Sequence, residues 1–116
     1  MASVTRAVRQ IIAGDARPLL VVGLSTPGPV DRLTGLLINP PSMPGWEGFN
    51  MRAALGAVMN AQLFVDNDAN TFALGALWRA RQAHGPATPE HWLVTKLSAS
   101  GIGAALITGG DLYRGA

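Results

Sequence analysis

The chain has no cysteine, which excludes disulfide bonds and zinc sites built from thiolates. It has two histidines, no third metal-binding side chain at ligand spacing near them, and therefore no predicted metal site. No apolar run approaches the ~20 residues that cross a bilayer, and no secretion signal opens the chain, so we expect a cytoplasmic protein without a membrane partner. Charged residues make up 14% of the chain and are scattered, which argues against a nucleic-acid-binding stripe.

What is present fits one α/β domain at most. The 116 residues are 48% hydrophobic, enough for a modest core, and the net charge is +2. The nine basic residues are eight arginines and a single lysine, Lys96.

Hydrophobic spacing in the first half predicts alternating strands and helices. Apolar residues recur at helical spacing over residues 3–13, and a continuous apolar run over 19–24 predicts a strand buried on both faces. A short strand is expected at 36–38 and another at 63–65, with a helix between them that Asn50 caps.

The second half predicts a long helix followed by three strands. The helix ends at Gly85-Pro86, and one face of it gathers apolar residues: Ala69, Phe72, Ala73, Ala76 and Leu77. Strands are expected at 92–97 and 104–108, and Gly109-Gly110 is expected to turn the chain into Leu112-Tyr113.

A polar cluster, Asp66-Asn67-Asp68-Ala69-Asn70, lies where a predicted strand ends and a helix begins. Ligands of α/β folds bind at such carboxyl ends of strands. One interpretation is helix capping, which needs one such side chain. The other is chemistry on a substrate hydroxyl, with a carboxylate as general base and Asn67 holding a polyol.

Small residues and glycines, Ser98 to Gly103, lie between two predicted strands. Such a segment lets backbone N–H groups approach a phosphate, although a tight hairpin without a ligand explains it equally well. A dinucleotide-binding loop is excluded because a strand, not a helix, is expected to follow.

Two loops could line a pocket. In Ser25-Thr26-Pro27-Gly28-Pro29-Val30-Asp31, Gly28 leaves room for a ligand, and in Met43-Pro44-Gly45-Trp46 an aromatic ring could form a wall. Turn architecture and ordinary packing of the tryptophan are the alternatives.

These motifs, taken in order with Gly101-Ile102-Gly103-Ala104-Ala105-Leu106 and Leu112-Tyr113-Arg114-Gly115, resemble the ROK family (repressor, open reading frame, kinase) over nearly the whole chain. The resemblance implies an actin-like ATPase fold, related to ribonuclease H, with a mixed sheet and flanking helices. We expect residues 1–116 to be an incomplete ROK domain: most of the N-terminal lobe plus the start of the second phosphate-loop region.

The resemblance also assigns roles to individual residues. It makes Asp68 the base that takes the proton of the attacking sugar hydroxyl, and Asn67 a sugar ligand beside it. It places Gly28, and less directly Gly45, in the sugar pocket. It assigns the second phosphate loop to three residues: Ser100, Gly101 and Gly103.

Departures from the family bear on which function to expect. The family kinases open with an Asp-x-Gly-x-Thr phosphate loop, which does not precede the first helix here, and Ala99-Ser100 replaces their Gly-Thr. The segment Lys96-Leu97-Ser98 is more similar to the family's regulators. The family's Glu-x-Gly-His element and its zinc ligands would lie beyond Ala116.

The resemblance leaves two functions and one further alternative. The favoured one is the sugar-sensing part of a transcriptional regulator, without a cofactor, reaching operator DNA only through a helix-turn-helix expected before residue 1. The other is part of an ATP- and Mg²⁺-dependent kinase of a hexose or N-acetylhexosamine. The chain alone could also be an inactive fragment, and an uncovered strand edge makes a homo-oligomer a further expectation.

Overall fold

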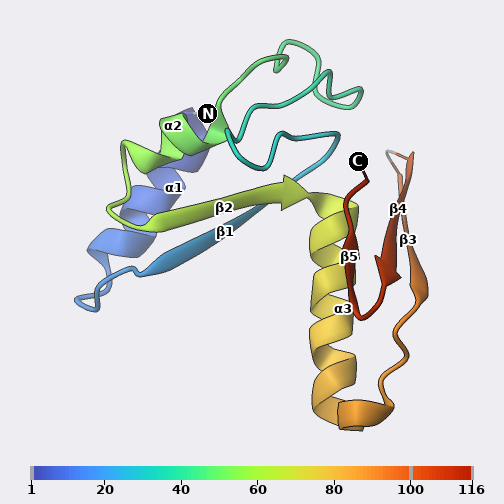
Figure 1. Ribbon diagram of the computed structural model, residues 1–116. Coiled ribbons are helices and arrows are strands. Elements are labelled where there is room, and N and C mark those ends of the chain that lie inside the picture. Colours follow the sequence, from blue (N-terminus) through green and yellow to red (C-terminus); the bar gives the residue numbers. More distant parts are fainter. Residues whose placement is uncertain (1, 100, 116) are drawn as a thin grey trace. The chain divides into compact units, whose positions relative to one another are not determined.

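The computed structural model describes residues 2–99 and 101–115, with element labels as in Figure 1. The chain divides into two compact units, Met1–Asp66 and Asn67–Ala116. Each unit has its own cluster of buried hydrophobic side chains and is described by itself.

The first unit contains α1 (Ala2–Ala13), β1 (Val21–Thr26), α2 (Met51–Gly56) and β2 (Gln62–Asn67), except that Asn67, the last residue of β2, belongs to the second unit. The predicted first helix is confirmed, and Gly14 follows its end with an N–H that donates to the carbonyl of Gln10 at 3.2 Å. Val8 and Ile12, one turn apart, pack against the core of this unit.

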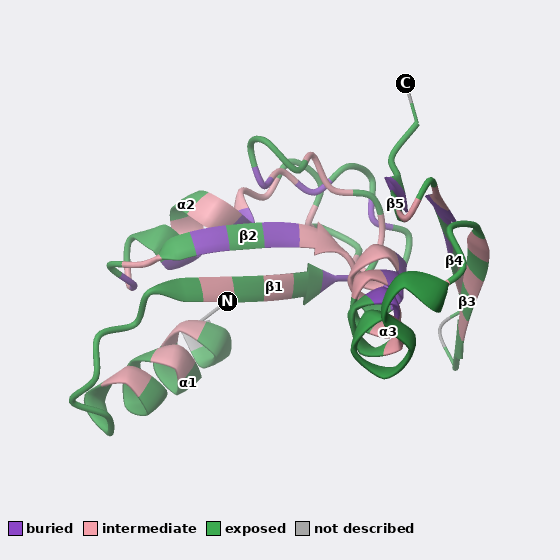
Figure 2. Cartoon of the chain, turned by 60° about the horizontal axis from the view of Figure 1, so that its bottom comes forward, coloured by how far each residue is buried: buried purple, intermediate pink, exposed green. Residues whose placement is uncertain are grey.

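β1 and β2 form a two-stranded sheet in which both arrows point the same way (Figure 2). The expectation that the run 19–24 is buried on both faces is wrong. The run begins before β1, and along β1 exposed residues alternate with half-buried ones, so that Val21 is 56% exposed whereas Val22 and Leu24 pack against the core. This alternation is the two-residue period of a strand with one covered face.

The predicted second helix is confirmed but shorter than its apolar spacing suggests. The Asn50 side chain accepts the N–H of Ala53 at 2.8 Å and caps α2. The strand expected at 36–38 is reduced to two isolated bridges, Val30↔Leu37 and Leu36↔Asn50. After Asn39, Pro40-Pro41 supplies no N–H groups to extend a ladder.

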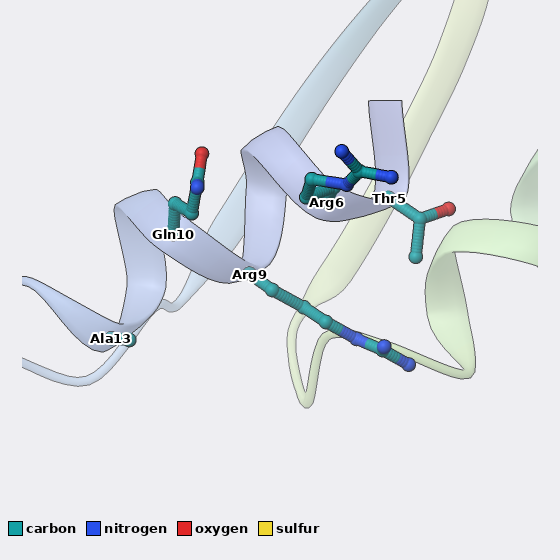
Figure 3. Close-up of a pocket in the computed structure, with 5 residues that line it drawn as sticks. All are labelled: Thr5, Arg6, Arg9, Gln10 and Ala13. Atoms are coloured by element: carbon teal, nitrogen blue, oxygen red, sulfur yellow. The ribbon is translucent and has the colours of Figure 1, made fainter. Parts of the chain in front are cut away.

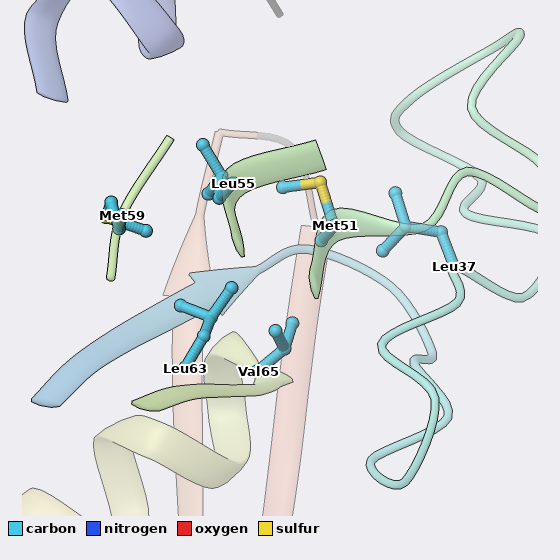
Figure 4. Close-up of a cluster of buried hydrophobic side chains, with 6 residues drawn as sticks. All are labelled: Leu37, Met51, Leu55, Met59, Leu63 and Val65. Atoms are coloured by element: carbon cyan, nitrogen blue, oxygen red, sulfur yellow. The ribbon is translucent and has the colours of Figure 1, made fainter. Parts of the chain in front are cut away.

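The core of the first unit lies between α2, β2 and the 36–38 segment (Figure 4). Its buried side chains are Leu37, Met51, Leu55, Met59, Leu63 and Val65.

The second unit contains α3 (Asp68–His84), a short 3-10 helix η1 (Gly85–Ala87), β3 (Trp92–Ser98), β4 (Gly101–Thr108) and β5 (Asp111–Tyr113). The three strands form an antiparallel sheet in the order β3-β4-β5. Gly109 and Gly110 both have positive φ, 58° and 77°, as a two-residue type I′ hairpin turn requires, so the predicted turn is confirmed.

One face of this sheet packs on α3. The buried side chains are Ala69, Ala73 and Leu77 from the helix and Ala105, Ile107 and Leu112 from the sheet. Phe72, which the sequence predicts on the buried face, is 55% exposed, which corrects that expectation. Positions 69, 73 and 77 are four residues apart and form one narrow stripe, and Phe72 lies beside it.

The opposite face of the three-stranded sheet is mainly apolar and exposed, with Thr95, Thr108 and Asp111 among its residues. It carries Leu93, Leu97, Ile102, Leu106 and Tyr113, which are between 41% and 77% exposed. Of the helices that the structure describes, none is long and apolar enough to cross a membrane.

Candidate functional site

The junction of β2 and α3 is built around the Asn67 side chain. Its Oδ1 accepts the backbone N–H groups of Ala69 at 2.9 Å and Asn70 at 3.4 Å. Its backbone is extended, with φ −62° and ψ 147°, which is the usual geometry of a helix N-cap. Asn67 therefore caps α3, and the capping interpretation of this motif holds for this residue.

Asp68 has a different role from its neighbour, because its carboxylate is part of an ion pair. It is the first residue of α3, and its Oδ2 accepts a hydrogen bond from the Lys96 ammonium group on β3. The Asp68 side chain is 26% exposed and the Lys96 side chain 35%, so the pair is shielded but still reachable from solvent. A negative charge in the first turn also favours the helix dipole.

Gly103 allows the start of α3 to lie directly on the sheet. It pairs with Lys96 across the β3–β4 ladder, and a Cβ built on it would lie 3.0 Å from the Cβ of Ala69. The absence of a side chain at Gly103 is therefore explained by packing. The structure brings Asn67, Asp68 and Gly103 together within the second unit.

Gly101 has the geometry of a hairpin tip. It pairs with Ser98, its φ is 138°, and no atom lies within 4 Å of a Cβ built on it. Its carbonyl accepts the Ser98 hydroxyl at 3.2 Å. Gly101 is the first residue of β4, so a strand and not a helix follows the glycine-rich segment, as predicted. Ser100 lies outside the described residues.

The two pocket-lining glycines predicted from the loops lie in the first unit. Gly28 has a φ of 84°, and a Cβ on it would meet the Pro40 side chain at 2.9 Å, so this glycine permits two loops to pack closely. The same two loops meet where the Thr26 hydroxyl contacts the Met43 sulfur at 3.8 Å. Gly45, with a φ of 83°, has open space around its Cβ position.

Two further residues of these loops, Trp46 and Asp31, make contacts within the first unit. Trp46 packs against the core, and its ring lies 5.0 Å from that of Phe49. The Asp31 carboxylate accepts the N–H groups of Leu33 at 2.8 Å and Thr34 at 3.0 Å. The bond from Thr34, then that from Leu33, holds the pKa of Asp31 below its usual range.

Two hollows lined by described residues lie apart from the predicted site residues. One of about 610 Å³ lies along α1 and is lined by Thr5, Arg6, Arg9, Gln10 and Ala13 (Figure 3). The Arg6 and Arg9 side chains diverge there and do not converge on one anion (Figure 3). Another, of about 350 Å³, is lined by residues of α3 and β3 and the segment before β3: Ala80, His84, Pro89, His91 and Trp92.

Lys96 is the residue that the sequence argument did not assign to the site. Its partner Asp68 is 28 residues away in the chain, and no local spacing joins them. The signal that could have found it is composition, because Lys96 is the one lysine among nine basic residues and falls at an inward position of a predicted strand. Among the described residues, no three His, Cys, Asp or Glu side chains gather as a metal site would require.

Comparison with known families decides the identity of the fold. The model of the ROK family matches residues 3–116. The chain belongs to the ROK family.

Curated relatives of this ROK chain carry the names of both enzymes and regulators. A glucokinase of Thermotoga maritima is 28% identical over 112 residues, which cover 97% of this chain and 33% of the relative. A putative xylose repressor of a Caldicellulosiruptor species is 29% identical over 98 residues, covering 84% of this chain and 23% of the relative. The chain thus spans a third or less of the length of these two proteins.

Solved structures show the same fold. A putative N-acetylmannosamine kinase from Listeria monocytogenes superposes with a TM-score of 0.78 at 23% identity, over 98% of this chain and 37% of that one. A ROK family protein from Streptococcus pneumoniae, solved in complex with sucrose, gives 0.74 at 25% identity, over 99% and 36%. The ROK chain therefore has the α/β, actin-like ATPase fold that the sequence predicted, present as part of a domain with two sheets and helices.

Proposed function

We propose that this chain carries part of the sugar-recognition site of a ROK-family transcriptional regulator. The observation that supports the proposal is the Asp68 carboxylate, held by Lys96 in the first turn of α3 beside the capping residue Asn67. Carboxylates and carboxamides are the groups that bind the hydroxyls of a polyol. We further propose that residues 1–116 form most of the N-terminal lobe of a ROK domain and the start of its second phosphate-loop region.

The β3–β4 hairpin favours a regulator over a kinase. Two described residues are assigned to a phosphate loop. Gly101 lies near the hairpin tip with open space beside it and could approach a phosphate. Gly103 faces α3, and the Ala69 side chain occupies the space beside it. The hairpin also carries Ala99 where the kinases have glycine. Its residues therefore fit a nucleotide phosphate only in part.

A kinase is the second candidate, and the match to the Thermotoga glucokinase over 112 residues favours it. ATP would supply the phosphoryl group and Mg²⁺ would be the metal cofactor. The contribution of this chain would be Asp68, which would take the proton of the attacking hydroxyl, and Asn67, which would hold the sugar.

The test is a sugar titration followed by NMR of the backbone amides, which detects millimolar binding. A panel of hexoses and N-acetylhexosamines is added to the wild-type chain, Asp68→Asn and the control Asp111→Asn. Asp111 lies in the same unit, and its side chain accepts the N–H of Leu112, a bond that asparagine retains. We expect shifts at Asn67 and Asp68 that Asp68→Asn loses and the control keeps.

The same samples with ATP and Mg²⁺ separate the two candidates. A regulator piece binds sugar and forms no ADP above background. ADP formation that depends on sugar and is abolished by Asp68→Asn would establish the kinase instead. A panel without any shift in the wild-type chain would refute sugar recognition by this chain.

A further inference from the structure

We propose that Lys96 is a specificity-determining residue of the sugar site, which binds the same ligand hydroxyl as Asp68. The inference rests on the proposed function and extends it to a residue that the family resemblance does not assign. In this arrangement the hydroxyl donates a hydrogen bond to the Asp68 carboxylate, while its oxygen accepts a hydrogen bond from the Lys96 ammonium.

The position of Lys96 on the sheet is unusual for a charged residue. Along β3 it lies on the same face as Trp92 and Val94, the face that packs on α3. A lysine there places its aliphatic stem along apolar surface, as lysines at the margin of a core do. Opposite it on β4 is Gly103, which has no side chain to cover the stem. Its ammonium group therefore ends beside the first turn of α3, where it pairs with Asp68.

The ion pair leaves hydrogen-bonding capacity on both partners. An ammonium group has three N–H donors, and the contact with Asp68 Oδ2 uses one of them. A carboxylate has about four lone-pair positions on its two oxygens, of which the same contact uses one. Both side chains are about one-quarter to one-third exposed, so a small solute can reach them.

A hydroxyl group matches this pair because it donates and accepts at the same time. A ligand group that only accepts hydrogen bonds would be repelled by the Asp68 carboxylate. A group that only donates hydrogen bonds would be repelled by the Lys96 ammonium. The pair therefore selects for a ligand hydroxyl over an ether, a carbonyl or a protonated amine at this position. Because hydrogen bonds to charged groups are the stronger ones, loss of the ammonium should weaken sugar binding about tenfold or more.

The single lysine makes the test direct. A chain labelled with ¹³C-lysine gives one side-chain lysine signal, that of Lys96. This signal and the backbone amides are followed together while a hexose that shifts Asn67 and Asp68 is added. We expect the Lys96 Cε–Hε signal to shift along the same binding curve, and not to shift with the deoxy analogue that lacks the contacted hydroxyl.

Substitutions give the second readout. Lys96→Met keeps the length of the stem and should weaken binding about tenfold, whereas Lys96→Arg keeps the charge and should retain most of the affinity. Arg79→Met is the matched control, since it removes an exposed cation from α3 and should leave binding unchanged. The labelled wild-type titration needs no variant and so remains decisive if Lys96→Met does not fold.

The outcomes separate this inference from the proposed function. If the amides of Asn67 and Asp68 shift while the Lys96 signal stays still and Lys96→Met binds normally, sugar recognition stands and the assignment of Lys96 is overturned. If no sugar shifts any of these signals, both fall together.

Discussion

Gly103 is the residue at which packing and function are most easily confused. Its place in a glycine-rich hairpin suggests a phosphate loop, but its neighbour is the Ala69 side chain. We expect Gly103→Ala to destabilise the second unit by about 1–3 kcal/mol, because the new methyl group meets a rigid helix at 3.0 Å. Urea unfolding followed through the amide signals of β3 and β4 measures this.

The matched control is Gly75→Ala in the middle of α3, where nothing lies within 4 Å of the new Cβ. Glycine costs a helix interior roughly 0.5–1 kcal/mol relative to alanine, so this variant should be more stable than the wild type by about that amount. Equal and small effects of both alanines would mean that α3 does not lie against β4 as described.

Asp31 gives the chain a predictable response to acid. Its folded pKa is lower than the ordinary value of 3.8, because its carboxylate accepts the N–H groups of Thr34 and Leu33. A lowered folded pKa means that the carboxylate stabilises the fold above pH 3.8 and that this contribution is lost as the pH falls through the folded pKa. The ¹³C signal of the Asp31 carboxyl should titrate with a midpoint below 3.8.

Asp31→Asn keeps an acceptor and removes the charge, so its melting temperature should fall less than that of the wild type between pH 5 and pH 2. Asp15, whose pKa is lowered by its bonds to Arg17, titrates in the same range and remains in both proteins. The difference between the two melting curves therefore isolates Asp31. Parallel curves would contradict its role in the turn.

The β2–α3 junction that holds the candidate site was predictable from its sequence motif, but the contacts made there were not. The run Asp66 to Asn70 indicated a strand-to-helix junction with polar side chains, and Asn67 and Asp68 are placed at that junction. That Asn67 and not Asp68 caps α3 depends on the extended backbone of Asn67, which the residue types alone do not determine. The ion pair of Asp68 with Lys96 depends on how α3 packs on β3, so local spacing could not reveal it.

At the scale of elements, two of the helices are preceded by an asparagine whose side chain accepts a backbone N–H of the first turn. These are Asn50 for α2 and Asn67 for α3. Replacing such a cap by alanine costs about 1 kcal/mol. We expect Asn67→Ala to lower the stability of the second unit by about that amount, and Asn50→Ala to lower that of the first.

Native-state hydrogen exchange measures the two units separately. The variant at Asn67 should speed exchange in α3, and the variant at Asn50 in α2. Asn67→Asp is the matched control, because aspartate caps as well as asparagine and should restore the protection of α3. Unchanged exchange in α3 of Asn67→Ala would show that the cap contributes nothing there.

The order and type of most elements were predictable. The strand expected at 36–38 is reduced to two bridges, and the other errors concern which faces are covered. Hydrophobic periodicity predicted the helix that Asn50 caps and the strand at 63–65, and the glycine pair predicted the Gly109-Gly110 turn. Periodicity overestimated burial at Val21, because a continuous apolar run has no period that distinguishes one covered face from two. It placed Phe72 inward, because helical spacing predicts a wider apolar face than the narrow stripe of Ala69, Ala73 and Leu77 that the sheet covers.

At the scale of the whole molecule, large apolar side chains are exposed to solvent in both units. In the second unit, the outer face of the β3-β4-β5 sheet bears the cross-strand pairs Leu93↔Leu106 and Leu97↔Ile102. Thr95 and Ala104 pair between them, and the charged Asp111 lies on β5 at the margin of the same face. The net charge of +2 offers little repulsion between molecules. Contiguous apolar patches of this kind promote association in water.

We therefore expect the 116-residue chain to self-associate as its concentration rises, with this outer face as the contact. Replacing Leu97 by glutamate and Ile102 by lysine puts opposite charges directly across the ladder, which favours the strand pairing while making the face polar. Sedimentation equilibrium should show a mass that increases with concentration for the wild type and stays near 12.1 kDa for the double variant. Leu33→Lys, which changes an isolated leucine on a turn of the first unit that is 76% exposed, should associate as the wild type does. A wild type that remains at its monomer mass at all concentrations, or a Leu33→Lys variant that dissociates as fully as the double variant, would contradict this assignment of the contact.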